Sequence, residues 1–156
     1  MYGLLLKLWK FLRLSKGTQL FFLRRLNDKF LVGVGGIILN DRSEVLLFNH
    51  TYRRKARWGL PGGYIKGGEH PKEALEREIE EESGLIVSAD ERLKLRTDRE
   101  SSRIEVIYMG TFIGGEFRPS REVRAAKFYS FENLPEILPD QLYFIEKALK
   151  EKGLRV

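Results

Sequence analysis

The sequence predicts an α/β fold in which a mixed β-sheet is sandwiched between helices that cover both of its faces. A β-branched, glycine-containing run at residues 30–39 is typical of a buried strand. A helix is predicted from Pro71 to Gly84, because proline suits a first helical position and glycine suits the left-handed position after the last turn. Strand candidates flank this central helix, and further helix candidates lie near both ends of the chain, which favours a sheet between helices.

The first 29 residues are predicted to be a basic, amphipathic helical extension of a single domain at residues 30–156. Residues 2–14 would place three basic side chains on one side of a helix and a wide apolar face on the other. Gly17 is expected to break this helix, and the segment at residues 19–29 is predicted to be helical as well. A chain of 156 residues, 42% of them hydrophobic, is long enough for one domain with its own core.

The predicted domain continues from its first strand through a turn into a second strand. Asn40 and Asp41 mark the turn, and residues 44–48 form the returning strand. Residues 51–66 are predicted to be a loop, because glycine and proline interrupt them. The remaining predicted elements are strands at residues 85–95, 103–113 and 123–131 and a helix from Pro139 to Lys150.

The net charge of the chain belongs to its first 29 residues. The formal net charge is +6, and residues 1–29 hold seven Lys or Arg against Asp28 alone, so the rest of the chain is neutral overall. We expect this segment to pack its apolar face on the domain or on a second subunit of a homodimer, or to contact an anionic membrane surface peripherally. Nucleic-acid contact is less favoured, because the aromatic side chains are not interleaved for base stacking.

The composition excludes several kinds of site. The chain has no cysteine, which excludes disulfides, thiolate zinc sites and a cysteine nucleophile. Nothing therefore indicates an oxidising compartment, and a cytoplasmic location is expected. No apolar run is long enough to span a bilayer, and the N-terminus lacks the pattern of a secretory signal.

Seven glutamates occupy the fourteen positions of residues 69–82, which read EHPKEALEREIEEE. Winding this segment as a helix with about 3.6 residues per turn places Glu73, Glu76 and Glu80 on a side that needs only water. We therefore expect their replacement to have little effect.

A second group of glutamates, Glu78, Glu81 and Glu82, falls on a different side of the same predicted helix. They border the apolar pair Leu75 and Ile79, where desolvation makes repulsion between like charges costly. A hard divalent cation would relieve that repulsion, because carboxylate oxygens are preferred ligands of Mg²⁺ and Mn²⁺. Taken alone, a glutamate-rich helix is more often a charged face that only meets solvent. The segment just before this helix is what favours a cation site.

Glycine-rich and basic residues precede this helix. Residues 60–68 read LPGGYIKGG, in which Gly62 and Gly63 would let the backbone approach a ligand closely. The start of the helix would add the positive end of its dipole. Basic side chains in the preceding loop are expected to face an anionic substrate. They are Arg53, Arg54, Lys55 and Arg57.

Together these features resemble the Nudix box, the motif of the Nudix hydrolase superfamily. The segment from Gly63 to Leu85 agrees with that motif at every defined position. The matching residues are Gly63, Glu69, Arg77, Glu78, Ile79, Glu81, Glu82, Gly84 and Leu85. The resemblance extends more loosely from about Phe30 to Leu134 and does not cover residues 1–29.

The resemblance implies the Nudix fold and a metal-dependent reaction. The implied metal site for Mg²⁺ or Mn²⁺ consists of Glu78, Glu81, Glu82, Glu69 and Gly63, with Glu69 as an outer ligand. Arg77 would orient a glutamate and would not contact the substrate. The implied reaction is hydrolysis of a diphosphate linkage in a nucleoside diphosphate joined to another group. The alternative is a Nudix-fold module that binds or senses a nucleotide without cleaving it, which the intact glutamates disfavour.

The resemblance requires no serine, histidine or cysteine nucleophile. His50 and His70 are the only histidines, and both are expected to be ordinary loop residues. The general base is expected to be a glutamate, either from the motif or from a late loop. The candidates are Glu82, Glu81, Glu122 and, as a second choice in the late loop, Glu116.

The substrate remains open at the level of the sequence. Residues 100–104 lack both the proline typical of ADP-ribose hydrolases and the tyrosine typical of dinucleoside-polyphosphate hydrolases. The signatures of coenzyme A and NADH hydrolases are missing as well. Nucleoside triphosphates, nucleotide sugars and capped RNA ends all fit the motif.

Overall fold

The computed structural model describes residues 15–98 and 101–154. The chain divides into two compact units, Met1–Phe30 and Leu31–Val156. The helix predicted at residues 2–14 lies outside the described residues, and the assignment of residues 1–29 as an extension of the domain stays a prediction.

In the first unit the described residues form one helix, α2 (Lys16–Leu26). It begins earlier than predicted, because the Ser15 side chain caps it by accepting a hydrogen bond from the Thr18 N–H at 3.2 Å. Gly17 lies in the first turn of α2. The helix that it was predicted to end lies outside the described residues, so that expectation stays a prediction. Large apolar side chains are exposed along α2. They are Leu20, Phe21, Phe22, Leu23 and Leu26.

The membrane contact and the homodimer predicted for residues 1–29 stay predictions. Liposome co-sedimentation of the intact chain beside a chain that starts at Asp28 tests the membrane contact, since unchanged binding after truncation would exclude it. No helix in the described part of the chain is long and apolar enough to cross a bilayer.

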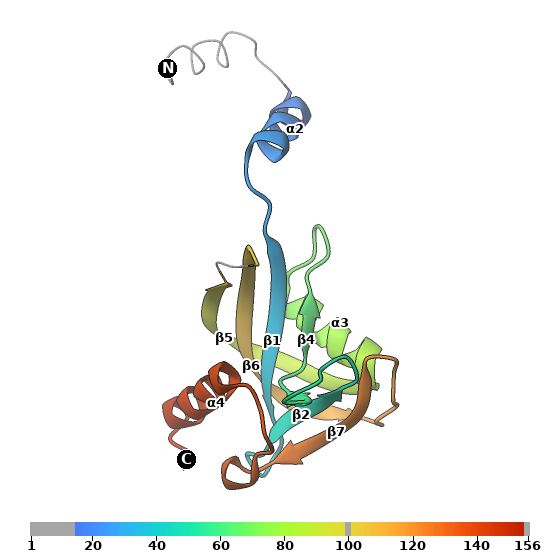
Figure 1. Ribbon diagram of the computed structural model, residues 1–156, viewed down its shortest axis with the longest axis vertical. Helices are drawn as coiled ribbons and strands as arrows, with labels where there is room; N and C mark the ends of the chain where they lie inside the picture. The colour runs from blue at the N-terminus through green and yellow to red at the C-terminus, as the bar shows by residue number, and fades with distance from the viewer. Residues whose placement is uncertain (1–14, 99–100, 155–156) are drawn as a thin grey trace. The chain divides into compact units, whose positions relative to one another are not determined.

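The second unit is built around one mixed sheet (Figure 1). Its strands are β1 (Leu31–Leu39), β2 (Val45–His50), β3 (Trp58–Gly59), β4 (Gly62–Tyr64), β5 (Leu85–Asp98), β6 (Arg103–Gly115) and β7 (Val123–Tyr129). Neighbouring strands follow the order β3-β2-β1-β6-β5, while β4 pairs with β1 and β7 pairs with β2. The β1–β6 pair is parallel and the others are antiparallel, so the predicted mixed sheet is confirmed.

Two helices cover opposite faces of this sheet, α3 (Pro71–Ser83) and α4 (Pro139–Glu151), and a short 3₁₀ helix, η1 (Phe131–Asn133), precedes α4 (Figure 1). Side chains alternate between the faces along each central strand. In β2, Leu46 and Phe48 pack in the core that contains α3, whereas Val45 and Leu47 pack in the core that contains α4. This two-sided burial explains the nearly continuous apolar strands and confirms the predicted α/β sandwich.

The predicted loop at residues 51–66 differs most from the prediction, because two short strands, β3 and β4, lie within it. The β4 strand passes very close to β1. A Cβ atom added at Gly62 would lie 2.2 Å from the carbonyl oxygen of Val34, so only glycine fits this crossing. The close pairing of β4 with β1 places the glycine loop beside α3.

Candidate functional site

Both ends of α3 are fixed by local interactions. The His70 side chain caps its start by accepting a hydrogen bond from the Lys72 N–H at 3.2 Å, and Glu73 accepts one from the His70 N–H at 3.3 Å. Gly84 ends the helix in the left-handed region with φ of 72°. His70 is thus a helix cap and not an ordinary loop residue. Packing of Ala74, Leu75 and Ile79 in the core sets which side the glutamates face.

Arg77 ties several predicted site residues together. Its guanidinium donates to both carboxylate oxygens of Glu69, at 2.6 and 2.9 Å. It also donates to Glu78 at 2.7 Å and to Glu81 at 3.1 Å. The hydrogen bond from Arg77 is the main reason that the pKa of Glu69 is lowered to about 2, and the same contact raises the pKa of Arg77. Arg77 therefore fixes the side chains of Glu69, Glu78 and Glu81 relative to one another.

Glu82 has a different environment. Its Oε2 is buried and has no hydrogen-bond partner in the described residues. The pKa of Glu82 is raised to about 7, mainly by burial and also by the nearby charges of Glu122, Glu78 and Glu81. The fold therefore gathers negative charge around one partly buried carboxylate.

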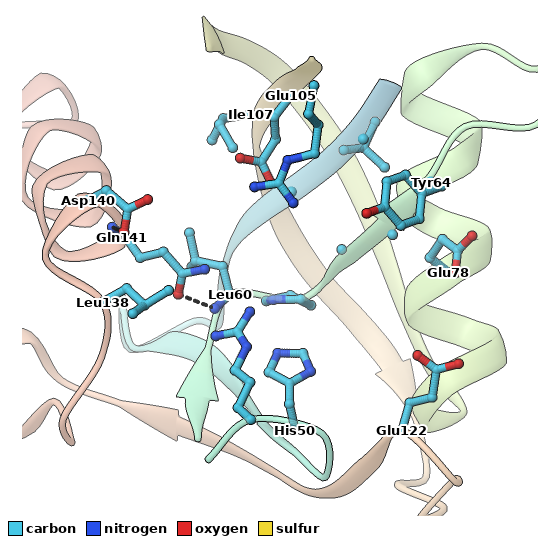
Figure 2. Close-up of a pocket in the computed structure, with 18 of the residues that line it drawn as sticks. His50, Leu60, Tyr64, Glu78, Glu105, Ile107, Glu122, Leu138, Asp140 and Gln141 are labelled. Atoms are coloured by element: carbon cyan, nitrogen blue, oxygen red, sulfur yellow. Dashed lines mark hydrogen bonds between the residues drawn. The ribbon is translucent and has the colours of Figure 1, made fainter. Parts of the chain in front are cut away.

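A cavity of about 700 Å³ opens between α3, the glycine loop and the start of α4 (Figure 2). At one end it is lined by the carboxylates of Glu78, Glu82 and Glu122. Basic side chains of the preceding loop also line it, namely Arg53, Arg54 and Lys55. A cavity of this size suits a nucleotide-sized ligand.

The other end of the cavity is formed by α4 and strands β5 and β6. Arg96 pairs with Asp140 and lies 3.9 Å from a carboxylate oxygen of Glu105. Gln141 is fixed because its Oε1 accepts a hydrogen bond from the Leu60 N–H at 3.1 Å, which Figure 2 draws as a dashed line.

His50, at the end of β2, lines the same cavity and is only 2% exposed. Neither ring nitrogen has a hydrogen bond of normal geometry within the described residues. The pKa of His50 is lowered from 6.5 to about 4, mainly by burial and also by the charge of Arg53, while the Leu60 backbone opposes the shift. The imidazole is therefore neutral at pH 7.

Because His50 is buried in its neutral form, we expect it to make the free energy of unfolding fall in acid. Because the pKa of His50 is about 4 in the folded state and 6.5 when unfolded, the unfolded state binds the extra proton first as the pH falls. The contribution of the neutral His50 to the free energy of unfolding is complete above pH 6.5. About 2 kcal/mol of that contribution should be lost between pH 7 and pH 5. Because the raised pKa of Glu82, about 7, acts in the opposite direction and is common to both proteins, the measured quantity is a difference: in urea unfolding the wild type should lose about 2 kcal/mol relative to His50→Gln between pH 7 and pH 5. Equal losses in the two proteins would contradict the prediction.

The predicted site residues fall into two groups. Those that line the cavity are Glu78, Glu82, Glu122, Gly62, Gly63, Arg53 and Arg54. Those that do not line it are Glu69, Arg77, Glu81, Glu116 and Arg57. Glu116 lines a separate surface hollow with Glu80 and Glu81. Among the two late-loop glutamates, the structure therefore brings Glu122 beside Glu82 and leaves Glu116 outside the cavity.

The residues present suit a divalent cation in their chemistry. Within residues 15–98 and 101–154, no three His, Asp or Glu side chains are close enough together to enclose a metal ion as they stand. However, the Oε2 of Glu82 has no hydrogen-bond partner among the described residues and is available as a metal ligand. Gly63 leaves space against Glu78 that a side chain would fill, since an added Cβ would lie 2.4 Å from the Glu78 carboxyl carbon. The set Glu69, Glu78, Glu81 and Glu82 thus fits an oxygen-ligated cation.

The expectation that Glu73, Glu76 and Glu80 only face water is wrong for two of them. Glu73 completes the cap of α3. Glu76 accepts a hydrogen bond at 2.8 Å from the buried Ala89 N–H, at a point where the register of β5 against β6 shifts. The helical period of α3 could not predict this contact, because the bulge in β5 is what brings the Ala89 N–H to the helix. Glu80 is exposed, as expected.

Replacing Glu76 by alanine should therefore destabilise the protein. The Ala89 N–H would be left buried without its acceptor, which costs about 1–2 kcal/mol. Glu80→Ala, four residues along the same helix, removes an exposed glutamate and should change stability by less than about 0.5 kcal/mol. Thermal or urea unfolding of both variants provides the measurement, and equal stability of the two would refute the role of Glu76.

Several cavity residues were not predicted from the sequence. They are His50, Tyr64, Arg96, Glu105, Asp140 and Gln141. His50 was expected to be an ordinary loop residue, yet its position at the end of a buried strand was a signal that its ring would be buried. Asp140 and Gln141 follow the proline of a predicted helix start, but no local pattern connects that start to the glutamate helix.

Comparisons with known proteins agree with this geometry. The family model described as NUDIX domain matches residues 29–149. An ADP-ribose pyrophosphatase from Methanocaldococcus jannaschii is 32% identical over 126 residues, which cover 78% of this chain and 75% of that protein. A human 8-oxo-dGDP phosphatase is 31% identical over 131 residues, which cover 80% of this chain and 40% of that protein.

Among solved structures, a NUDIX hydrolase from Nitrosomonas europaea matches with a TM-score of 0.71 and 19% sequence identity, over 83% of this chain and 77% of that chain. At this identity the likeness concerns the fold alone. The mixed sheet between α3 and α4 is thus shared with a known hydrolase fold.

Proposed function

This chain belongs to the Nudix hydrolase superfamily, and from that premise we propose that it hydrolyses a diphosphate linkage in a nucleoside diphosphate joined to another group. The observation that carries the proposal is the single cavity that joins the glutamates of α3 to the basic side chains of the preceding loop. The glutamates suit a cation, the arginines suit phosphate oxygens, and the opposite end of the cavity is free to hold the nucleoside.

We further propose that Mg²⁺ or Mn²⁺ is the cofactor and that Glu69, Glu78, Glu81, Glu82 and Gly63 hold it. When bound, such an ion neutralises phosphate oxygens and lowers the pKa of a bound water. Arg77 acts indirectly, because its hydrogen bonds keep the side chains of Glu69, Glu78 and Glu81 oriented. Glu122, close to Glu82 on the wall of the cavity, is the residue we propose to accept a proton from the attacking water.

The nucleoside is proposed to bind at the end of the cavity formed by α4. Gln141 offers a fixed donor there and Asp140 an acceptor, a pair that suits the polar edge of a base. Phe144 and Ile107 supply apolar walls at the same end. Because one relative is an ADP-ribose pyrophosphatase and another an 8-oxo-dGDP phosphatase, ADP-ribose and 8-oxo-dGDP are the first substrates to test.

The test is a screen for product release from nucleoside diphosphate derivatives, with Mg²⁺, with Mn²⁺ and with excess EDTA. Chromatography should detect a nucleoside monophosphate from at least one substrate, and EDTA should abolish its formation. The alternative, a module that binds nucleotide without cleaving it, predicts binding by calorimetry with no monophosphate from any compound. That result would overturn the proposed function.

A further inference from the structure

Unpaired polar atoms are found on the wall of the cavity. Both ring nitrogens of His50, the Nη1 of Arg53 and the Oε2 of Glu82 are buried without a hydrogen-bond partner in the described part of the chain. All three residues line the cavity. A fold recovers the cost of such atoms when a ligand supplies the missing partner. Glu82 belongs to the proposed cation site, whereas His50 and Arg53 have no role in that site.

The His50 ring is held in place by its neighbours on the same side of the chain. Phe48, two residues earlier, lies 6.3 Å away between ring centroids, and Tyr52, two residues later, lies 5.3 Å away. In Figure 2 the ring points toward the cavity and lies between Gln141 on one side and Glu122 on the other. His50 is therefore placed between the proposed nucleoside end and the glutamate end.

The charge state of His50 determines what it offers to a ligand. A neutral imidazole carries one N–H donor and one acceptor nitrogen. The guanidinium of Arg53 has only donors, and its positive charge helps to keep the imidazole neutral. His50 and Arg53 thus offer two hydrogen-bond donors to one cavity, and Arg53 adds a positive charge. This combination suits the oxygens of a phosphate group.

We infer that His50 and Arg53 together hydrogen-bond a phosphate oxygen of the substrate and so position the diphosphate between the glutamates and the α4 end of the cavity. This inference rests on the proposed function for the identity of the substrate. It assigns His50 a contact with the substrate that the motif does not include.

The experiment compares His50→Leu, which is apolar and of similar size, with His50→Gln, which keeps an N–H donor. His50→Leu should raise KM about 10- to 100-fold, because a hydrogen bond to a charged group is lost. His50→Gln should raise KM by a smaller factor, about 3-fold. Binding of ADP, measured by calorimetry, should weaken in the same order. His50→Leu should also unfold at a temperature no lower than the wild type, because it removes unpaired buried polar atoms.

A second measurement on the wild type does not depend on the variants folding. Addition of ADP should shift the ¹⁵N signals of the His50 ring, because one ring nitrogen gains a partner. Unchanged ring signals, or an unchanged KM and ADP affinity in a folded His50→Leu, would overturn the inference. If the wild type cleaves no substrate but ADP still binds through His50, the proposed function fails while this inference stands.

Discussion

Replacing Glu82 by glutamine should lower kcat/KM about 10³-fold while leaving the fold intact. Glutamine has nearly the same shape but carries no charge, so the variant removes one anionic ligand from the proposed cation site. Loss of a single group that stabilises the transition state electrostatically costs on the order of 10²- to 10³-fold in rate, and weaker cation binding adds to this. The measurement is steady-state kinetics over a range of Mg²⁺ concentrations.

The stability of Glu82→Gln should be equal to or higher than that of the wild type. Burial and the nearby charges of Glu122, Glu78 and Glu81 disfavour a carboxylate at this position, which the raised pKa of about 7 reflects. Lower activity together with an equal or higher melting temperature is typical of a residue kept for function.

Glu80→Gln is the matched control for Glu82→Gln, since it removes a glutamate from the exposed side of the same helix. It should keep both the activity and the melting temperature of the wild type. Comparable activity of the two variants would show that Glu82 has no part in the reaction, and a large loss in the control would show that α3 as a whole is sensitive to charge.

The placement of Glu78 and Glu82 beside Gly63 could be predicted from the sequence because these residues are local, whereas Glu122 reaches the same end from a distant loop. Gly63 and the glutamates lie within one segment of 23 residues whose loop and helix follow from glycine, proline and the helical period. The match to the NUDIX domain confirms the resemblance drawn from that segment. The sheet between two helices was also predictable, because strands buried on both faces are apolar throughout.

The α4 end of the cavity could not be predicted, because it depends on strand order. Asp140 lies more than fifty residues after Gly84 and reaches the cavity only because β6 pairs with β1 in parallel and α4 returns across the opposite face. The hydrogen bond of Glu76 could not be predicted from the sequence for a similar reason. Its partner amide belongs to a shifted register in β5, which the periodicity of α3 does not contain.

Two adjacent glycines should separate stability from activity. An alanine at Gly62 would place its Cβ 2.2 Å from the Val34 carbonyl oxygen and 2.9 Å from the Gly35 Cα, both of which are backbone atoms. The backbone cannot move aside without disturbing the pairing of β4 with β1. Gly62→Ala should therefore destabilise the protein by about 3 kcal/mol or more.

An alanine at Gly63 meets a side chain and not the backbone. Its Cβ would lie 2.4 Å from the carboxyl carbon of Glu78, and that side chain can rotate away. Gly63→Ala should cost less stability than Gly62→Ala, but it should lower kcat/KM about 10²-fold because a displaced carboxylate no longer meets the cation. Urea unfolding and steady-state kinetics on the same preparations measure both effects.

Gly67→Ala is the control for both glycine variants, because no atom beyond its chain neighbours lies within 4 Å of the Cβ that it adds. It should keep full activity and be slightly more stable, by less than about 1 kcal/mol, since alanine restricts the unfolded chain. The assignment of Gly63 to the cation site would fail if Gly63→Ala were fully active with normal dependence on Mg²⁺. In that case Glu78 would have to act from a second position, and the space that Gly63 leaves would serve only the packing of β4 against α3.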